Sequence, residues 1–184
     1  VIENNPTFLS FMKGSAVMQS MRLGASFFGS RGQFVAEQTN FDGKKIELMR
    51  SHKHGYFQPF PKNKIQGDGI YNKMPREERE LSEAQIINYK VSITESNGKV
   101  SIEIDIHGTD YVPVSLEMSF RPGGELTGVT ADKNAEDSYF LESGMGQYKK
   151  GDDVISFGPG MVTHKWAEMR GMLPKQNGHS VYIT

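Results

Sequence analysis

The chain contains no cysteine among its 184 residues. Thiol nucleophiles, thiolate metal sites and disulfide bonds are therefore excluded. A chain of this length buries roughly 70% of its unfolded surface when it folds, so its core does not depend on disulfides. The missing cysteine leaves the cellular compartment open, because many periplasmic and secreted bacterial proteins also lack this residue.

Long hydrophobic runs and an excess of one charge are also missing. No apolar run approaches the roughly 20 residues that span a bilayer. The chain has 21 Lys and Arg against 22 Asp and Glu, which gives a formal net charge of -1. Nucleic-acid and anionic-membrane surfaces select strongly basic patches. We therefore expect neither nucleic acid nor a membrane as a partner.

Short catalytic motifs of the common enzyme classes are absent as well. The sequence has no G-x-S-x-G nucleophile elbow, no P-loop and no dinucleotide-binding fingerprint. Whether the chain is an enzyme is therefore left open by its motifs.

Apolar and polar residues alternate strongly over residues 88–120. This pattern predicts three consecutive antiparallel strands. Asn97-Gly98 separates the first two runs, and this dipeptide favours a two-residue hairpin turn. Each run has an apolar face and a polar face, so a second layer must cover the apolar one. Twenty glycines fit a fold with many tight turns.

Similar short runs extend the strand pattern over the rest of the chain. Strands are expected at residues 15–28, 33–38, 45–58, 125–129, 139–141, 146–149, 154–157, 161–169 and 180–184. Residues 15–28 also suit a helix, but Gly24 and Gly29 would weaken it and favour a strand. The sequence thus predicts an all-β fold, an antiparallel β-sandwich of jelly-roll type, with one short helix in the 62–85 connection.

One domain is expected to span residues 1–184. The chain begins at Val1 and stops within the strand-like SVYIT, so we expect either a processed protein or a piece of a longer multidomain chain. The polar connection 59–85 is long for a compact domain, and such connections serve as lids, binding loops or domain contacts.

The strand at residues 45–58 is apolar at its start and polar at its end. Arg50, His52, His54 and Tyr56 share one face if the strand is regular. Two imidazoles on one face can share a divalent metal ion or can make ordinary hydrogen bonds. This change of character is typical of a strand that runs from a core into the mouth of a cleft.

Residues 151–166, GDDVISFGPGMVTHKW, combine a Gly-Asp opening, a short apolar strand, a Pro-Gly turn and a histidine. This segment resembles the second sequence motif of the cupin superfamily. The resemblance implies a metal-dependent enzyme with a divalent metal ligated by His164 and by the H-x-H pair His52 and His54. Gln58 stands near the place of the cupin glutamate and would be a fourth ligand.

The order of the later strands and turns, from the PGGEL turn through the GPG turn to SVYIT, is similar to a second group of proteins. These are the β-sandwich domains that accompany the catalytic domains of bacterial polysaccharide lyases and related glycan-degrading enzymes. The resemblance implies a carbohydrate-associated domain with a binding or structural role, in a periplasmic or extracellular setting. Its partners would be an acidic polysaccharide and a catalytic domain of the same protein.

In that interpretation the polar strand end has a direct chemical use. Arg50 would pair with the carboxylate or sulfate of an acidic sugar. Proton transfer during cleavage of a uronic acid would fall to His52, His54 and Tyr56. Tyr71 and Trp166 would either stack on sugar rings or belong to the core.

Overall fold

The structure is a computed structural model. It describes residues 1–2, 5–26, 32–60, 63, 65, 68, 70, 73 and 75–184. Not described are the side chains of His54, Tyr56, Phe57, Arg76, Leu81, Glu83 and Ala84. The described strands are β1 (Leu9–Lys13), β2 (Ala16–Ala25), β3 (Gln38–Phe41), β4 (Lys45–Phe57), β5 (Leu81–Ser96), β6 (Lys99–Gly108), β7 (Val114–Phe120), β8 (Glu125–Thr127), β9 (Thr130–Ala131), β10 (Ser138–Phe140), β11 (Gly146–Lys150), β12 (Asp153–Phe157) and β13 (His179–Ile183).

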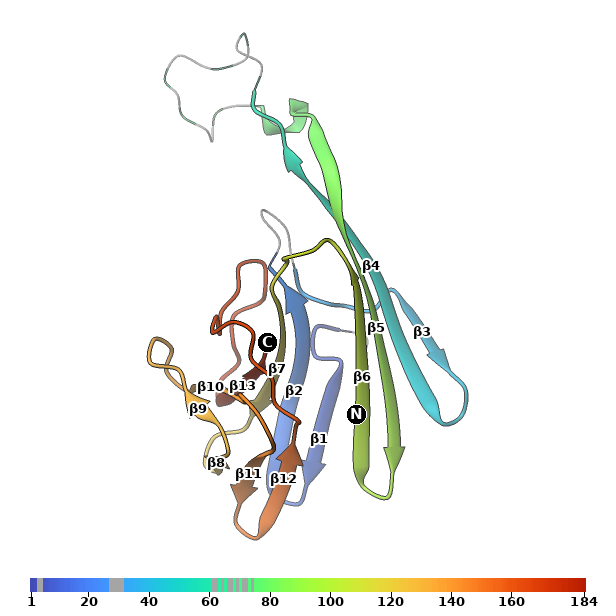
Figure 1. The fold of residues 1–184 in the computed structure, drawn as a ribbon, viewed down its shortest axis with the longest axis vertical. Helices are drawn as coiled ribbons and strands as arrows, with labels where there is room; N and C mark the ends of the chain where they lie inside the picture. Colours follow the sequence, from blue (N-terminus) through green and yellow to red (C-terminus); the bar gives the residue numbers. More distant parts are fainter. Residues whose placement is uncertain are drawn as a thin grey trace.

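These strands form three sheets, as Figure 1 shows. The largest sheet has the order β1-β2-β7-β13-β10-β9, the second has the order β3-β4-β5-β6, and the smallest has the order β12-β11-β8. Neighbouring strands are antiparallel except for β10 and β13, which are parallel. The prediction of an all-β protein with antiparallel sheets is confirmed, and the architecture is consistent with a β-sandwich. Among the described residues, no helix has the length and apolar character needed to cross a bilayer.

The alternating region at residues 88–120 is divided between two sheets. β5 and β6 pair as predicted, and both turn residues between them, Asn97 and Gly98, have positive φ values of 53° and 74°. The third strand, β7, leaves this sheet and pairs with β2 and β13 instead. The chain crosses between sheets just after Gly108, where Thr109 N donates a hydrogen bond of 2.9 Å to Ile86 O.

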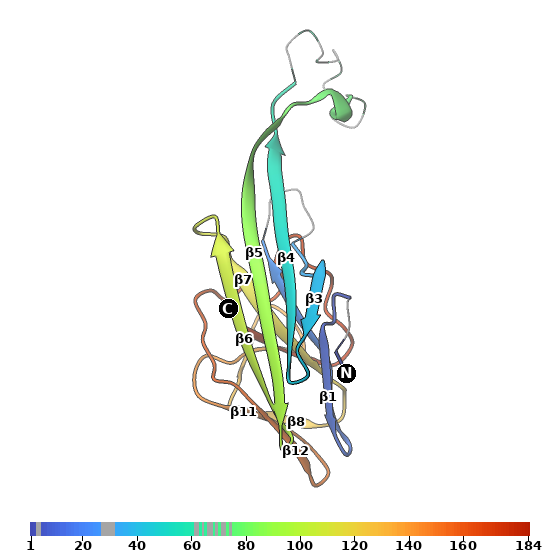
Figure 2. The same ribbon diagram turned by 90° about the vertical axis from the view of Figure 1, so that its right-hand side faces the viewer.

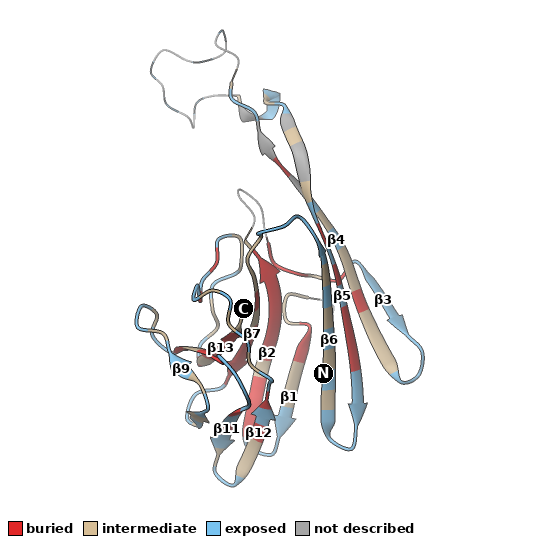
Figure 3. Cartoon of the chain, viewed as in Figure 1, coloured by how far each residue is buried: buried red, intermediate tan, exposed pale blue. Residues whose placement is uncertain are grey.

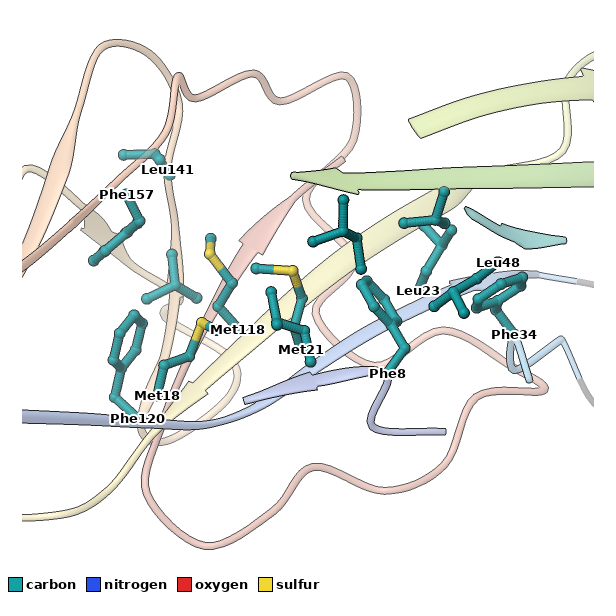
Figure 4. Close-up of a cluster of buried hydrophobic side chains, with 14 of the residues drawn as sticks. Phe8, Met18, Met21, Leu23, Phe34, Leu48, Met118, Phe120, Leu141 and Phe157 are labelled. Atoms are coloured by element: carbon teal, nitrogen blue, oxygen red, sulfur yellow. The ribbon is translucent and has the colours of Figure 1, made fainter. Parts of the chain in front are cut away.

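The core fills the space between the six-stranded and four-stranded sheets (Figure 4). Met21, Leu23 and Met118 from the larger sheet are buried in one cluster with Leu48 and Val91 from the smaller one. At one end the three-stranded sheet joins this core through aromatic rings. The ring of Phe120 lies 4.9 Å from the ring of Tyr148 and 4.9 Å from the ring of Phe157, measured between centroids.

Two of the predicted strands need revision. Residues 161–169 are not a strand: Val162 and His164 are partly buried and then Ala167 and Met169 are buried, so the buried side changes partway. The segment meets the end of the largest sheet at Thr184, where Thr184 N donates a hydrogen bond to Met161 O and Thr163 N donates one to Thr184 O. In the region 33–38, Gln33 forms only an isolated bridge with Gly24, and β3 begins at Gln38.

The expected helix in the 62–85 connection is not confirmed. The described part of this connection includes a 3-10 turn at Arg76–Glu78, and the chain is already in β5 from Leu81.

Two turns hold the smallest sheet against the largest one. The backbone N–H and the hydroxyl of Ser15, in the turn between β1 and β2, donate hydrogen bonds of 2.7 and 2.9 Å to Asp153 Oδ2. The Ser15 hydroxyl also lies 2.6 Å from the carbonyl oxygen of Lys150. The backbone N–H of Ser15, followed by its hydroxyl, holds the pKa of Asp153 below its ordinary value.

This geometry predicts a pH-dependent contribution to stability. A carboxyl whose pKa is lowered by folding stabilises the native state above its ordinary pKa, and that stabilisation is lost as the pH falls through the lowered value. We therefore expect Asp153→Ala to lower the Tm at pH 7 and to have a smaller effect below about pH 4. Thermal unfolding followed by circular dichroism across this range, with Asp152→Ala as the control, tests this. A Tm difference that stays constant with pH would contradict it.

Candidate functional site

The three central strands of the largest sheet, β2, β7 and β13, are buried on both faces. Figure 3 shows β2 buried over most of its length. One face packs on the core described above. The opposite face, here called the outer face, carries charged and hydroxyl side chains instead of apolar ones. Its buried polar residues are Ser20, Arg22, Ser115, Glu117, Ser119, Ser138 and Ser180.

An ion pair between Arg22 and Glu117 lies at the centre of the outer face. The two residues are direct cross-strand neighbours on β2 and β7. Arg22 Nε and Nη2 donate hydrogen bonds of 3.0 and 2.5 Å to Glu117 Oε2. The side chains are only 3% and 2% exposed, so both charges are removed from water. Such a pair is tolerated only when its remaining polar atoms also find partners.

Hydroxyl groups complete the coordination of the Glu117 carboxylate. Ser180 and Ser119 donate hydrogen bonds of 2.9 and 3.1 Å to Glu117 Oε1. Tyr182, which pairs with Glu117 across β13 and β7, lies on the same face. Burial, and next the negative charge of Glu117, raise the pKa of the Tyr182 hydroxyl well above its ordinary value. Tyr182 is therefore a neutral phenol at physiological pH.

Residues 158–178, here called the covering segment, extend across the outer face. Arg22 Nη1 donates a hydrogen bond of 3.1 Å to the carbonyl oxygen of Pro174. Gln19 Nε2 donates one of 2.6 Å to the carbonyl oxygen of Asn177. The covering segment also contributes Ala167 to a small apolar cluster with Phe140 and Tyr182. Side chains of the sheet thus fix the path of an irregular segment.

Two cavities adjoin the covering segment. The first has a volume of about 360 Å³ and is lined by Glu117 and Tyr182 of the sheet and by residues 167–175. The second, also about 360 Å³, lies between residues 134–137 and residues 176–178. Glu168 and Lys175 line both cavities, so the two adjoin there. Each volume is at the lower end of the range for small-ligand sites.

Trp166 lies in the same covering segment and presents an open aromatic surface. Its ring stacks on the imidazole of His164, with centroids 5.0 Å apart and an angle of 28° between the planes. Trp166 is nevertheless 58% exposed, so the exposure must come from the ring edges and the face opposite His164. The result is a flat apolar surface held in place from behind.

His164 is itself fixed by hydrogen bonds. The backbone N–H of Trp166 points at Nδ1 of His164 at 3.4 Å, and Nε2 lies 3.1 Å from the carbonyl oxygen of Val114. An Nδ1 that accepts requires a protonated Nε2, which then donates to the carbonyl. Both ring nitrogens are therefore engaged, and a metal bound at His164 would displace one of these bonds.

Arg50, expected to bind an acidic sugar, makes contacts within the chain. Its Nη1 donates a hydrogen bond of 2.7 Å to the carbonyl oxygen of Gln33, and its Nε lies 3.6 Å from Glu37 Oε1. Tyr89 of β5 lies directly across from Arg50 of β4. Burial raises the pKa of the Tyr89 hydroxyl to about 12, against a smaller opposing effect of Arg50.

The other predicted residues are only partly described. His52 is partly buried, and His54 and Tyr56 belong to β4, but the side chains of the latter two are not described. Gln58 is exposed at the end of β4. Tyr71 lies outside the described residues. Trp166 is exposed, and ligand binding by Arg50, Tyr56, Tyr71 and Trp166 stays a prediction.

A metal site that joins His52, His54 and His164 stays a prediction. Within the part of the chain that the structure describes, no group of three or more His, Asp or Glu side chains is arranged to hold a metal ion.

Sequence reasoning missed the buried polar network. In the alternation of residues 88–120, Glu117 falls on the polar face of its run, as Glu103 and Asp105 do, and such a face is expected to meet water. Glu103 and Asp105 are exposed, but Glu117 is buried. The available signal was the arrangement of small hydroxyl residues around Glu117, with Ser115 and Ser119 on its own strand face. A solvated face more often carries long charged side chains.

Comparisons of the chain with protein-family models, with curated proteins and with solved structures find no match.

The Arg22–Glu117 pair predicts strong coupling between two substitutions. Arg22→Met leaves a buried carboxylate without its cation, and Glu117→Leu leaves a buried guanidinium, so each should reduce the free energy of unfolding by about 3–5 kcal/mol. The double variant buries no unpaired charge and should lose far less than the sum. Urea unfolding of the four proteins measures this coupling. Additive effects would show that the pair is not a unit.

The metal hypothesis makes a separate prediction. If His52, His54 and His164 share a divalent ion, protein purified without chelator should carry close to one equivalent of metal. Both His52→Ala and His164→Ala should then remove it. Elemental analysis measures the metal content, with His107→Ala as the control because His107 is exposed and lies on the face of the four-stranded sheet opposite to that of His52. Metal that survives either of the first two substitutions would contradict a shared site.

Proposed function

We propose that this chain is a carbohydrate-binding β-sandwich domain of a secreted or periplasmic bacterial enzyme that degrades glycans. Binding is assigned to the Trp166 surface and to the two cavities beside the covering segment. In this proposal the domain binds the polysaccharide, and another domain of the same protein cleaves it. The jelly-roll topology and the short helix of the 62–85 connection stay predictions within this proposal.

The observation that carries the proposal is the exposure of Trp166 in a fixed orientation. Trp166 is the chain's only tryptophan, and one face of its ring is backed by His164. A pyranose ring presents a face of C–H groups that packs well on a flat indole, while its hydroxyls remain free to hydrogen-bond. A ring that is already held in place loses little conformational entropy when a ligand stacks on it.

The polar cavities support the same ligand class. Glu168 is next but one to Trp166 in the chain, and it lines both cavities together with Lys175. The second cavity is also lined by the amides of Asn134, Gln176 and Asn177. Carboxylate, ammonium and amide groups can donate hydrogen bonds to sugar hydroxyls or accept hydrogen bonds from them. A glycan stacked on Trp166 would thus have polar partners along the same segment.

The proposal predicts selective loss of glycan affinity in Trp166→Ala. Loss of one aromatic stack should cost roughly 1–1.5 kcal/mol, which corresponds to about a tenfold weaker affinity. Affinity electrophoresis and calorimetry against neutral and acidic polysaccharides, including pectate, alginate and xylan, measure this. The control is Phe41→Ala, which removes another exposed aromatic residue, 68% exposed, from edge strand β3.

Trp166→Phe should keep part of the affinity, because it keeps a smaller flat ring. Thermal unfolding of each variant checks that the fold is intact. The proposal is wrong if no polysaccharide binds the wild type, or if Trp166→Ala and Phe41→Ala bind equally well.

A further inference from the structure

The β4–β5 hairpin extends beyond the sheet to which it belongs. Figures 1 and 2 both show it rising above the rest of the molecule. On one side β3 pairs with β4 only as far as Met49. On the other side β6 pairs with β5 only from Ile87 onward. Residues 51–57 and 81–86, here called the arm, therefore form a two-stranded ribbon among the described residues.

The far end of the arm is closed by specific contacts. Gln58 N donates a hydrogen bond of 2.7 Å to the carbonyl oxygen of Glu80. Arg79 Nε donates one of 2.5 Å to the carbonyl oxygen of Gln58, and the Arg79 guanidinium lies 5.1 Å from the centroid of the Phe60 ring. An isolated two-stranded ribbon is only marginally stable in water. An arm with such an ordered end is suited to packing against a partner.

The β5 edge of the arm is closed at its base. On the β5 edge, Thr109 pairs with both backbone groups of Ile86, at 2.9 Å for Thr109 N to Ile86 O and 3.2 Å for Ile86 N to Thr109 Oγ1. On the β4 edge, odd-numbered residues bond toward β3, as the hydrogen bond from Asp42 N to Lys45 O shows. Ser51 and Lys53 continue this series and are exposed, and no described strand lies beside them.

The charge of the β4 side is also one-sided. Residues 49–67 contain Arg50, Lys53, Lys62 and Lys64 together with two histidines, and they contain no Asp or Glu. The other end of the connection has the opposite excess, because residues 76–83 contain four glutamates against the two cations Arg76 and Arg79. The open β4 edge therefore lies on the basic side of the hairpin.

We propose that the open β4 edge docks an extended, acidic segment of a partner protein domain, which adds to the sheet as a strand in line with β3. The backbone N–H and C=O groups of Ser51 and Lys53, beside which no described strand lies, would give the main-chain hydrogen bonds of strand addition. Lys53 would meet acidic side chains of the incoming strand. The site is separate from the Trp166 surface and does not depend on carbohydrate binding.

Charge argues against the most obvious alternative occupant, a second copy of this chain. Two-fold pairing of β4 edges would place Lys53 of each copy beside the basic strand of the other, and like charges across a strand pair are destabilising. An acidic glycan would match the charge, but it has no peptide groups that repeat in step with the strand edge.

The test uses the full chain and a labelled alternating Glu-Val peptide of about eight residues as the probe. Fluorescence anisotropy should show saturable binding that Lys53→Glu weakens by about tenfold. Lys53→Pro should weaken it at least as much, because it removes an outward N–H without breaking a β4–β5 bond. Lys44→Glu, with the same change of charge in the β3–β4 turn, should bind like the wild type. Hydrogen exchange should show protection confined to residues 51–53.

Four outcomes would overturn the proposal. The acidic peptide fails to bind the wild type, or an alternating Lys-Val peptide binds equally well. Lys53→Pro, shown to be folded by circular dichroism, binds the acidic peptide as tightly as the wild type. Labelled oligogalacturonate binds in a manner that Lys53→Glu abolishes while the peptide does not bind, which would assign the basic edge to an anionic glycan.

Discussion

The buried ion pair of Arg22 and Glu117 is the constraint on which the outer face of the largest sheet depends. Two charges without water need every remaining donor and acceptor to be satisfied. Glu117 finds Ser119 and Ser180 within the sheet. The third guanidinium nitrogen of Arg22, Nη1, donates to the carbonyl oxygen of Pro174. The sheet alone cannot complete this network, so the covering segment is part of it.

This dependence explains how an irregular segment comes to have a defined position. Residues 158–178 form no strand of a described sheet, and apolar burial within them is limited to a few residues such as Ala167 and Met169. Hydrogen bonds to Arg22 and Gln19 hold the end that contains Pro174 and Asn177. The cavities and the Trp166 surface are therefore placed by polar contacts, and their geometry should respond to changes in the buried network.

The alternation of apolar and polar residues predicted some strands correctly and others not. The β5–β6 hairpin was predictable because its polar face is exposed and its turn is Asn97-Gly98, so the local pattern and the fold agree. The alternation of residue types at residues 161–169 does not correspond to one buried side, because burial passes from Val162 and His164 to Ala167 and Met169. It does not distinguish a strand within a sheet from a segment that lies across one. Glu117 was misplaced because a polar face looks alike in sequence whether water or serine hydroxyls surround it.

The candidate sites also combine features that the sequence shows with features that only the structure shows. Trp166 could be proposed from sequence as an aromatic residue able to stack on a sugar ring, but its exposure and its stacking on His164 are visible only in the structure. The polar end of β4 was also recognisable, from Arg50 to Tyr56. β4 extends beyond the end of its neighbour β3. The length of this extension is set by how β4 pairs with β3 and β5, which the sequence of β4 alone does not show. Periodicity within one strand shows which face is apolar, whereas the point at which an edge becomes open is set by the lengths of its neighbours.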